Sequence, residues 1–270
     1  MNLGFGFGSF SQRPTLGRPK NRRLPDGTGR RRSLLPRLLR RAAGVLGALV
    51  LLGAVGIGGL WPLTPSVGDA EARITTRLAQ LHGRDAHALP VPDRVGQALI
   101  ATEDSRFYAH HGIDVVGITR AVLGPLRGNS GDPGGATLNQ QLAKVLYTAT
   151  GSSPIVKVEQ LELALKIDAH YSKAQILEMY LNAVYFGHGF YGLPAASRGY
   201  FHRAPADLNW AQASLLAGLL QAPSAYDPLR HLHLDRARQG HVLDRLVQTH
   251  VLSAGQAAAA AQAPLYLAQL

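Results

Sequence analysis

Ala101–Asp114, which reads ATEDSRFYAHHGID, is the stretch from which the rest of this chain can be interpreted. It places Glu103 and Asp104 side by side, after apolar residues that recur at helical spacing. The pattern predicts a helix over Asp93–Ala109 that presents the acidic pair. A helix-borne carboxylate beside an aromatic ring and a histidine suits a general base, because partial burial raises a carboxylate pKa toward neutral pH. The flanking residues that support this interpretation are Val95, Ala98, Leu99, Ile100, Phe107 and His110.

The same stretch raises the question of a metal site. Asp104, His110 and Asp114 could each bind a metal ion, but their spacing fits no strong ligand pattern. A structural hydrogen bond between His110 and Asp114 is therefore the prediction that we favour. The chain contains no cysteine, which excludes disulfides, zinc–thiolate sites and thiol nucleophiles.

The positive charge of the chain is concentrated at its N-terminus. The 270 residues include 28 Lys and Arg against 17 Asp and Glu, and eleven of the basic residues lie in residues 1–41, where Asp26 is the only acid. The rest of the chain is nearly neutral, so composition alone gives no support to a nucleic-acid-binding protein. We predict a disordered, basic tail over residues 1–41, and nucleic-acid binding by this tail is the weakest interpretation.

An uncharged apolar segment follows the tail. Ala42–Leu60 has 19 residues without a charge, which is just enough for a helix to span the hydrocarbon core of a membrane. A signal peptide would have a shorter apolar region and a small-residue cleavage site, and a buried core helix fits the arginine-rich flank less well. The sequence predicts a single transmembrane anchor at residues 42–61, with the basic tail in the cytoplasm. A connector at residues 62–74 then leads to one extracytoplasmic domain, residues 75–270.

Helical patterns dominate this predicted domain. Ser153 and Pro154 suit an N-cap followed by proline at the first helical position, and Ser172 with Gln175 matches a capping box. Residues 126–136 hold four glycines and a proline, which predicts a mobile loop. Strand signals are nearly absent, so we expect a mainly α fold. The other expected helices are Ala70–Leu81, Thr137–Tyr147, Ser153–His170, Ser172–Val184, Leu193–Phe201, Leu208–Leu220, Leu234–His250 and Gln256–Ala263.

Gly134–Lys144, GGATLNQQLAK, is the second group that could carry chemistry. Its glycines allow close approach of the backbone, the amides of Gln140 and Gln141 can bind an anion or a sugar, and Lys144 follows. It is not a Walker loop, because no Gly-Lys-Ser/Thr occurs. An ordinary amphipathic helix after a loop is the alternative.

Taken in order, these blocks resemble the peptidoglycan glycosyltransferases of family 51. Glu103-Asp104-x-x-Phe107-x-x-His110-x-Gly112-x-Asp114 is similar to the first motif of that family, and Gly134–Lys144 is similar to the second. Lys173–Asn182 resembles the fourth motif and Leu215–Pro228 the fifth. The resemblance covers roughly residues 75–270.

The resemblance implies a lysozyme-like, mainly α domain with a membrane-proximal jaw. It also implies a bacterial inner-membrane enzyme that polymerises lipid II into glycan strands, with inversion at the anomeric carbon and release of undecaprenyl diphosphate. Glu103 would be the general base, and Lys144 and Lys157 could supply cations near the leaving diphosphate. No cofactor is required, although Mg²⁺ or Mn²⁺ could assist the diphosphate. The remaining substrate-binding residues that the resemblance implies are Asp104, Phe107, His110, Thr137, Gln140, Gln141 and Asn182.

The third motif departs from the family pattern, which is Arg-Lys-x-x-Glu. Here Val156 takes the arginine position, Lys157 the lysine position and Gln160 the position of the second catalytic glutamate. Glutamine cannot act as an anion or a general acid, and loss of the arginine removes a bidentate phosphate donor.

Two functions therefore remain open. One is a monofunctional, membrane-anchored glycosyltransferase without a transpeptidase domain. The other is a weak or inactive relative that binds lipid II or glycan, or that docks other wall-synthesis proteins. A glycan-cleaving enzyme of similar fold is disfavoured, because the resemblance extends through the glycine-rich loop, the lysines and the fourth motif.

Overall fold

The computed structural model describes residues 44, 58–59, 61–82, 91–123, 136–148, 151 and 153–269. The chain divides into two units, Met1–Val50 and Leu51–Leu270, and every helix discussed below belongs to the second. Within the described residues the secondary structure is helical, and the only β-pairings there are two isolated bridges, His111 with Ile113 and Tyr185 with Tyr191. The predicted mainly α class is confirmed.

The helices follow one another through short connections. They are α2 (Ala70–His82), α3 (Asp93–Glu103), η1 (Phe107–Ala109), α4 (Val115–Leu123), α5 (Leu138–Tyr147), α6 (Pro154–His170), α7 (Lys173–Ala183), α8 (Leu193–Phe201), η3 (Pro205–Asp207), α9 (Trp210–Leu219), α10 (Pro228–Gln248) and α11 (Ala254–Gln262).

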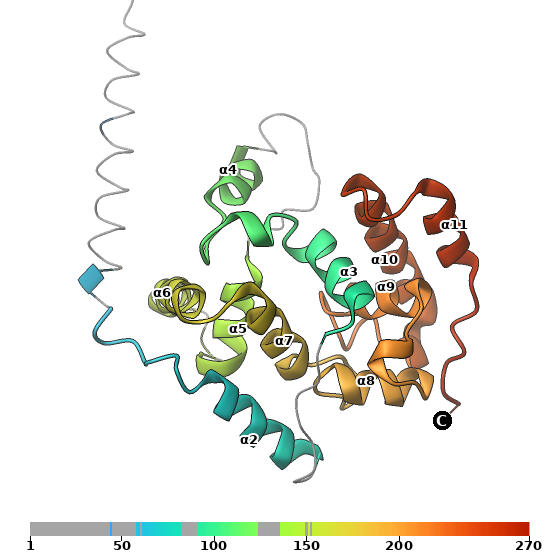
Figure 1. The fold of residues 1–270 in the computed structure, drawn as a ribbon, viewed down its shortest axis with the longest axis horizontal. Helices are drawn as coiled ribbons and strands as arrows, with labels where there is room; N and C mark the ends of the chain where they lie inside the picture. The colour runs from blue at the N-terminus through green and yellow to red at the C-terminus, as the bar shows by residue number, and fades with distance from the viewer. Residues whose placement is uncertain are drawn as a thin grey trace, which may run out of the picture. The chain divides into compact units, whose positions relative to one another are not determined.

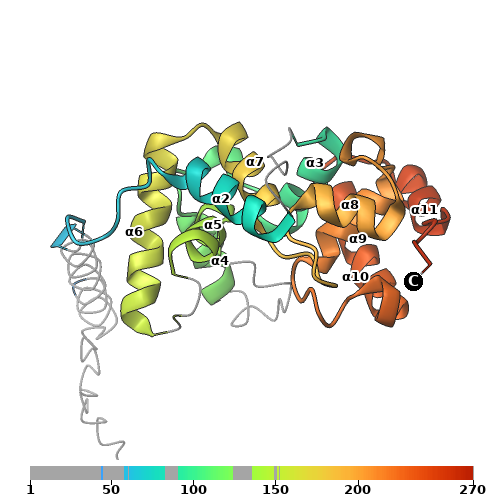
Figure 2. The same cartoon turned by 90° about the horizontal axis from the view of Figure 1, so that it is seen from below.

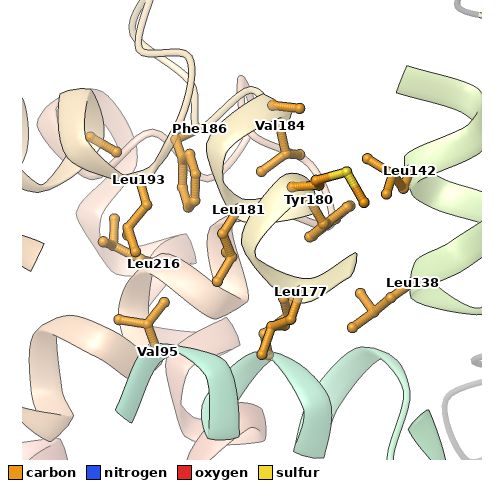
Figure 3. Packing of buried hydrophobic residues seen from close by; sticks show 14 of the residues in the cluster. Val95, Leu138, Leu142, Leu177, Tyr180, Leu181, Val184, Phe186, Leu193 and Leu216 are labelled. Atoms are coloured by element: carbon orange, nitrogen blue, oxygen red, sulfur yellow. The ribbon is translucent and has the colours of Figure 1, made fainter. Parts of the chain in front are cut away.

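Helix α7 lies at the centre of the larger hydrophobic core. Its Leu181 is fully buried and lies among side chains of α3, α5 and α9, as Figure 3 shows. Burial of each such side chain contributes roughly 1.5–3 kcal/mol to stability. Because α3 and α5 both pack on this core, the end of α3 is fixed relative to α5. The labelled residues that make these contacts include Val95, Leu138, Leu142, Tyr180 and Leu216.

A second cluster joins α3 to the C-terminal helices. Ala98 and Ala101 of α3 are buried against Ala217 of α9 and Val242 and Leu246 of α10. Alanine and glycine at these positions allow close approach of the helices. Figures 1 and 2 show α3, α9, α10 and α11 gathered in one group from two directions. This packing brings α10 alongside the C-terminal half of α3.

Local capping explains why most predicted helices are confirmed. The hydroxyl of Ser153 accepts from Val156 N, and Pro154 occupies the first turn of α6. Thr137 and Ser172 each form a capping box with the glutamine three residues later. Each cap contributes about 1 kcal/mol to its helix, and it satisfies backbone N–H groups that have no partner within the helix.

Three predicted boundaries were wrong or missing. The helix carrying Glu103 ends at that residue instead of at Ala109, because Asp104 takes a non-helical conformation (φ −151°, ψ 66°). Helix α10 begins at Pro228, six residues before the predicted start, with Asp227 as N-cap and non-helical dihedrals at His231. Helix α4 was not predicted.

Several predictions fall on residues outside those described. These are the basic tail, nearly all of the apolar span Ala42–Leu60, and the glycine-rich loop apart from Ala136. In the part of the chain that the structure describes, no helix has the length and apolar character needed to cross a membrane.

Candidate active site

Glu103 is the last residue of α3, and its carboxylate is held by a chain of hydrogen bonds. The side-chain amide of Gln141 on α5 donates to Glu103 Oε2 at 3.0 Å. The hydroxyl of Tyr180 on α7 donates to Gln141 Oε1 at 2.7 Å. Burial, with the nearby charge of Glu103, raises the pKa of Tyr180, so this hydroxyl stays protonated. A protonated donor on Oε1 fixes the orientation of the Gln141 amide, with its NH₂ group toward Glu103.

The other oxygen of Glu103 faces a cation. Arg238 Nη2 of α10 lies 3.8 Å from Glu103 Oε1, and the two side chains are 10% and 18% exposed. The carboxylate is therefore bounded by an amide on one side and a guanidinium on the other, while part of it remains open to solvent. A partly exposed, ionised carboxylate with fixed orientation is the arrangement that a general base needs.

Asp104, next in the chain, is buried and joins three segments. Its carboxylate accepts from the backbone N–H of Leu138 at 3.0 Å and contacts His110 Nε2 at 2.9 Å. Burial raises the pKa of Asp104, and these two contacts offset part of the rise. The predicted His110–Asp114 bond was wrong: Asp114 instead accepts from Arg106 at 3.2 Å. Asp104 thus fastens the end of α3 to the start of α5 and positions Glu103 beside Gln141.

Three more predicted site residues support this geometry from within. Phe107 is fully buried, and the hydroxyl of Thr137 donates to Gly112 O at 2.6 Å. Gln140 Oε1 accepts from Thr137 N at 2.7 Å as part of the α5 cap. Gly112 has φ +82°, and a Cβ there would lie 2.6 Å from Ala164 O, so only glycine fits this approach to α6. Contact of these residues with substrate stays a prediction.

The altered third motif lies on α6. The amide of Gln160 donates to the hydroxyl of Thr148, the residue that ends α5, at 2.9 Å. Lys144 and Lys157 are exposed, whereas Asn182 is buried and donates to Glu178 O of its own helix at 2.9 Å. The structure therefore joins Glu103 to Gln141 directly, and it gives Gln160 a neutral hydroxyl partner.

Two residues of the Glu103 environment were missed by the sequence reasoning. Tyr180 stands inside the fourth motif, but nothing local shows that its hydroxyl reaches a glutamine 39 positions earlier. Arg238 stands in a long helix with several other basic residues, and no pattern distinguishes it from them. Both contacts depend on how α7 and α10 pack.

A resident metal site is not seen in the described part of the chain. No three His, Cys, Asp or Glu side chains among those residues gather in a way that could hold a metal ion. Glu103 itself has Gln141 and Arg238 as neighbours, and a cationic neighbour disfavours a metal ligand.

Comparisons with known proteins agree with this site. The family model described as Transglycosylase matches residues 72–247. Penicillin-binding protein 1F of Bacillus subtilis is 38% identical over 170 residues, which cover 63% of this chain and 24% of that protein. Penicillin-binding protein 1A of Vibrio cholerae is 36% identical over 175 residues, covering 65% of this chain and 21% of that protein. This chain belongs to the transglycosylase family, the glycosyltransferases of family 51.

The extent of these matches limits what they imply. The chain spans about a quarter of the length of the curated relatives that it matches. A crystal structure of penicillin-binding protein 1A from Haemophilus influenzae aligns with a TM-score of 0.40 and 22% identity, over 68% of this chain and 18% of that chain. That likeness is too distant to inform the site.

Proposed function

We propose that this protein is a membrane-anchored peptidoglycan glycosyltransferase that polymerises lipid II into glycan strands. The observation that carries the proposal is the Glu103 carboxylate, which is partly exposed and held by Gln141 and Arg238 within a domain of the transglycosylase family. The fourth-motif tyrosine, Tyr180, supports this arrangement through Gln141.

The proposed chemistry is an inverting transfer. Glu103 accepts the proton of the 4-hydroxyl of the acceptor sugar as that oxygen attacks the anomeric carbon of the growing strand. The bond to the lipid diphosphate breaks, and the diphosphate leaves with the bonding electrons. Lys144 and Lys157, both exposed, supply positive charge for the leaving group. A divalent cation such as Mg²⁺ or Mn²⁺ would then arrive with the diphosphate of the substrate.

The domain arrangement belongs to the same proposal. Residues 42–61 anchor the protein in the bacterial inner membrane, with the tail, residues 1–41, in the cytoplasm. After the connector, residues 62–74, the domain at 75–270 works on the outer face of that membrane with a lysozyme-like fold and a membrane-proximal jaw. A lipid-linked substrate requires an enzyme held at the membrane, and this arrangement provides one.

One observation favours a second candidate, a weak or inactive relative that holds lipid II or glycan, or that docks other wall-synthesis proteins. The second carboxylate position of the family motif is Gln160, whose amide is engaged by Thr148. An amide can neither donate a proton as an acid nor bind a cation by charge. Val156 also lacks the phosphate-binding fork of an arginine.

Polymerisation of labelled lipid II by the detergent-solubilised, full-length protein tests the proposal. We expect glycan strands that lengthen with time, measured with added Mg²⁺ or Mn²⁺ and with EDTA. Saturable binding of lipid II without strands would favour the second candidate. The double substitution Val156→Arg with Gln160→Glu should then restore activity. If it restores none, the third motif is not the cause of inactivity.

A further inference from the structure

We propose that Arg238 is a positioning residue for Glu103, which keeps the carboxylate ionised and aimed at the acceptor hydroxyl. The inference rests on the proposed function, in which Glu103 is the general base. It assigns a role to α10, where none of the motifs in the sequence analysis lies. The observation behind it is the approach of Arg238 Nη2 to Glu103 Oε1 at 3.8 Å, with both side chains largely buried.

The position of Arg238 is fixed by two other contacts between helices. Two turns along α10, Arg245 Nε donates to Ala101 O of α3 at 3.0 Å, which ties the two helices together beside Glu103. On the opposite side, Gly218 of α9 leaves room for the arginine stem, because a Cβ there would lie 3.0 Å from Arg238 Cγ. The guanidinium is thus directed to Glu103 by the packing of three helices.

The charges around Glu103 determine what Arg238 can do. Helix α5 presents the neutral amide of Gln141, α7 presents the protonated hydroxyl of Tyr180 through that amide, and α10 presents the cation of Arg238. Asp104, the next residue in the chain, is an acid, and its charge disfavours ionisation of Glu103. An opposite charge within about 4–6 Å favours the ionised form of a carboxylate by roughly one to three pH units, with the lower figure suited to a partly exposed pair.

A purely structural role for Arg238 makes a different prediction. Its stem packs on α9, so any substitution could lower stability without changing the chemistry of Glu103. Arg245 provides a matched control, since it is also an arginine of α10 that contacts α3, but through a backbone carbonyl instead of the carboxylate. A change specific to Arg238 therefore reports on Glu103.

The test compares Arg238→Gln, Arg238→Lys and Arg245→Gln in the full-length protein. We measure lipid II polymerisation against pH, and the titration of the Glu103 carboxyl by infrared difference spectroscopy of protein labelled with ¹³C-glutamate, using Glu103→Gln to assign the band. For Arg238→Gln we expect the acid limb of the rate profile and the infrared midpoint to move up by about one pH unit, with kcat reduced at least tenfold and KM little changed. Arg238→Lys should keep the limb in place, and Arg245→Gln should lower the melting temperature alone.

An unchanged limb and midpoint in Arg238→Gln would overturn the proposal, as would an equal shift in Arg245→Gln. If Arg238→Gln does not fold, Gly218→Ala takes its place, because it displaces the arginine stem and keeps every charge. A smaller upward shift is expected there, and no shift overturns the inference. The infrared midpoint needs no turnover, so it decides on Arg238 even if lipid II polymerisation, and with it the proposed function, fails.

Discussion

Removal of a single hydroxyl tests how the base is held. In Tyr180→Phe the donor to Gln141 Oε1, which lies 2.7 Å away, is lost and the ring stays in place. Loss of a hydrogen bond that leaves an acceptor partly buried costs about 1–2 kcal/mol of stability. For a domain of this size we expect the melting temperature to fall by about 2–6 °C.

The larger effect should fall on activity. Without the hydroxyl, nothing in this contact chain fixes the Gln141 amide, and a half-turn would place its oxygen against Glu103 Oε2 in place of the NH₂ group. Such a loss of orientation, worth about 1.4 kcal/mol in the transition state, reduces kcat about tenfold. The measurement is the initial rate of lipid II polymerisation at a temperature where both proteins are folded.

Tyr200→Phe is the matched control. Tyr200 is also fully buried, and its hydroxyl donates to a backbone carbonyl, Phe186 O, at 2.9 Å. We expect this variant to lose similar stability and to keep its rate. If the two variants lose activity equally, or if Tyr180→Phe keeps the full rate, the reasoning about Gln141 is refuted.

Two further predictions concern buried acids. Asp104→Ala leaves the Leu138 N–H and His110 without their buried partner, so urea unfolding should show a loss of about 2–4 kcal/mol, and a loss below about 1 kcal/mol would contradict its role as a clasp. Asp235 is fully buried on α10, and burial raises its pKa to about 8. Because the folded value lies above the unfolded value, the contribution of Asp235 to stability is complete below about pH 4 and is lost as the pH rises through 8. Asp235→Asn should therefore be more stable than the unsubstituted protein at pH 9, by at least about 1 kcal/mol, and should differ little at pH 5. Melting curves across this range test this, and a difference independent of pH would count against it.

Helix boundaries were predictable from the sequence where short-range capping determines them. Ser172 and Gln175 form the capping box that their spacing predicts, and α8 has the predicted bounds, Leu193–Phe201. The end of α3 was not predictable in this way. It depends on the bond from Asp104 to Leu138, which lies 34 residues further along the chain. Helix α4 was missed because its first turn, Val-Val-Gly-Ile, has low helix propensity.

The candidate site divides in the same manner. Glu103 and Gln141 were both singled out from their motifs, and the structure brings them into contact. The pairing of His110 with Asp104 instead of Asp114, and the approach of Arg238, follow from helix packing that no local pattern contains. Residue types thus indicated the chemistry, and tertiary contacts determined the partners.

The most direct test of the account is polymerisation of lipid II by Glu103→Gln beside Glu71→Gln. Glu71 is a matched acid, since it too accepts from a glutamine amide, that of Gln175 at 3.4 Å, but on the exposed face of α2. We predict that the protein makes glycan strands, that Glu103→Gln makes none while keeping its melting temperature, and that Glu71→Gln makes them at the normal rate. Strands made by Glu103→Gln at an undiminished rate would contradict the central claim that Glu103 is the base.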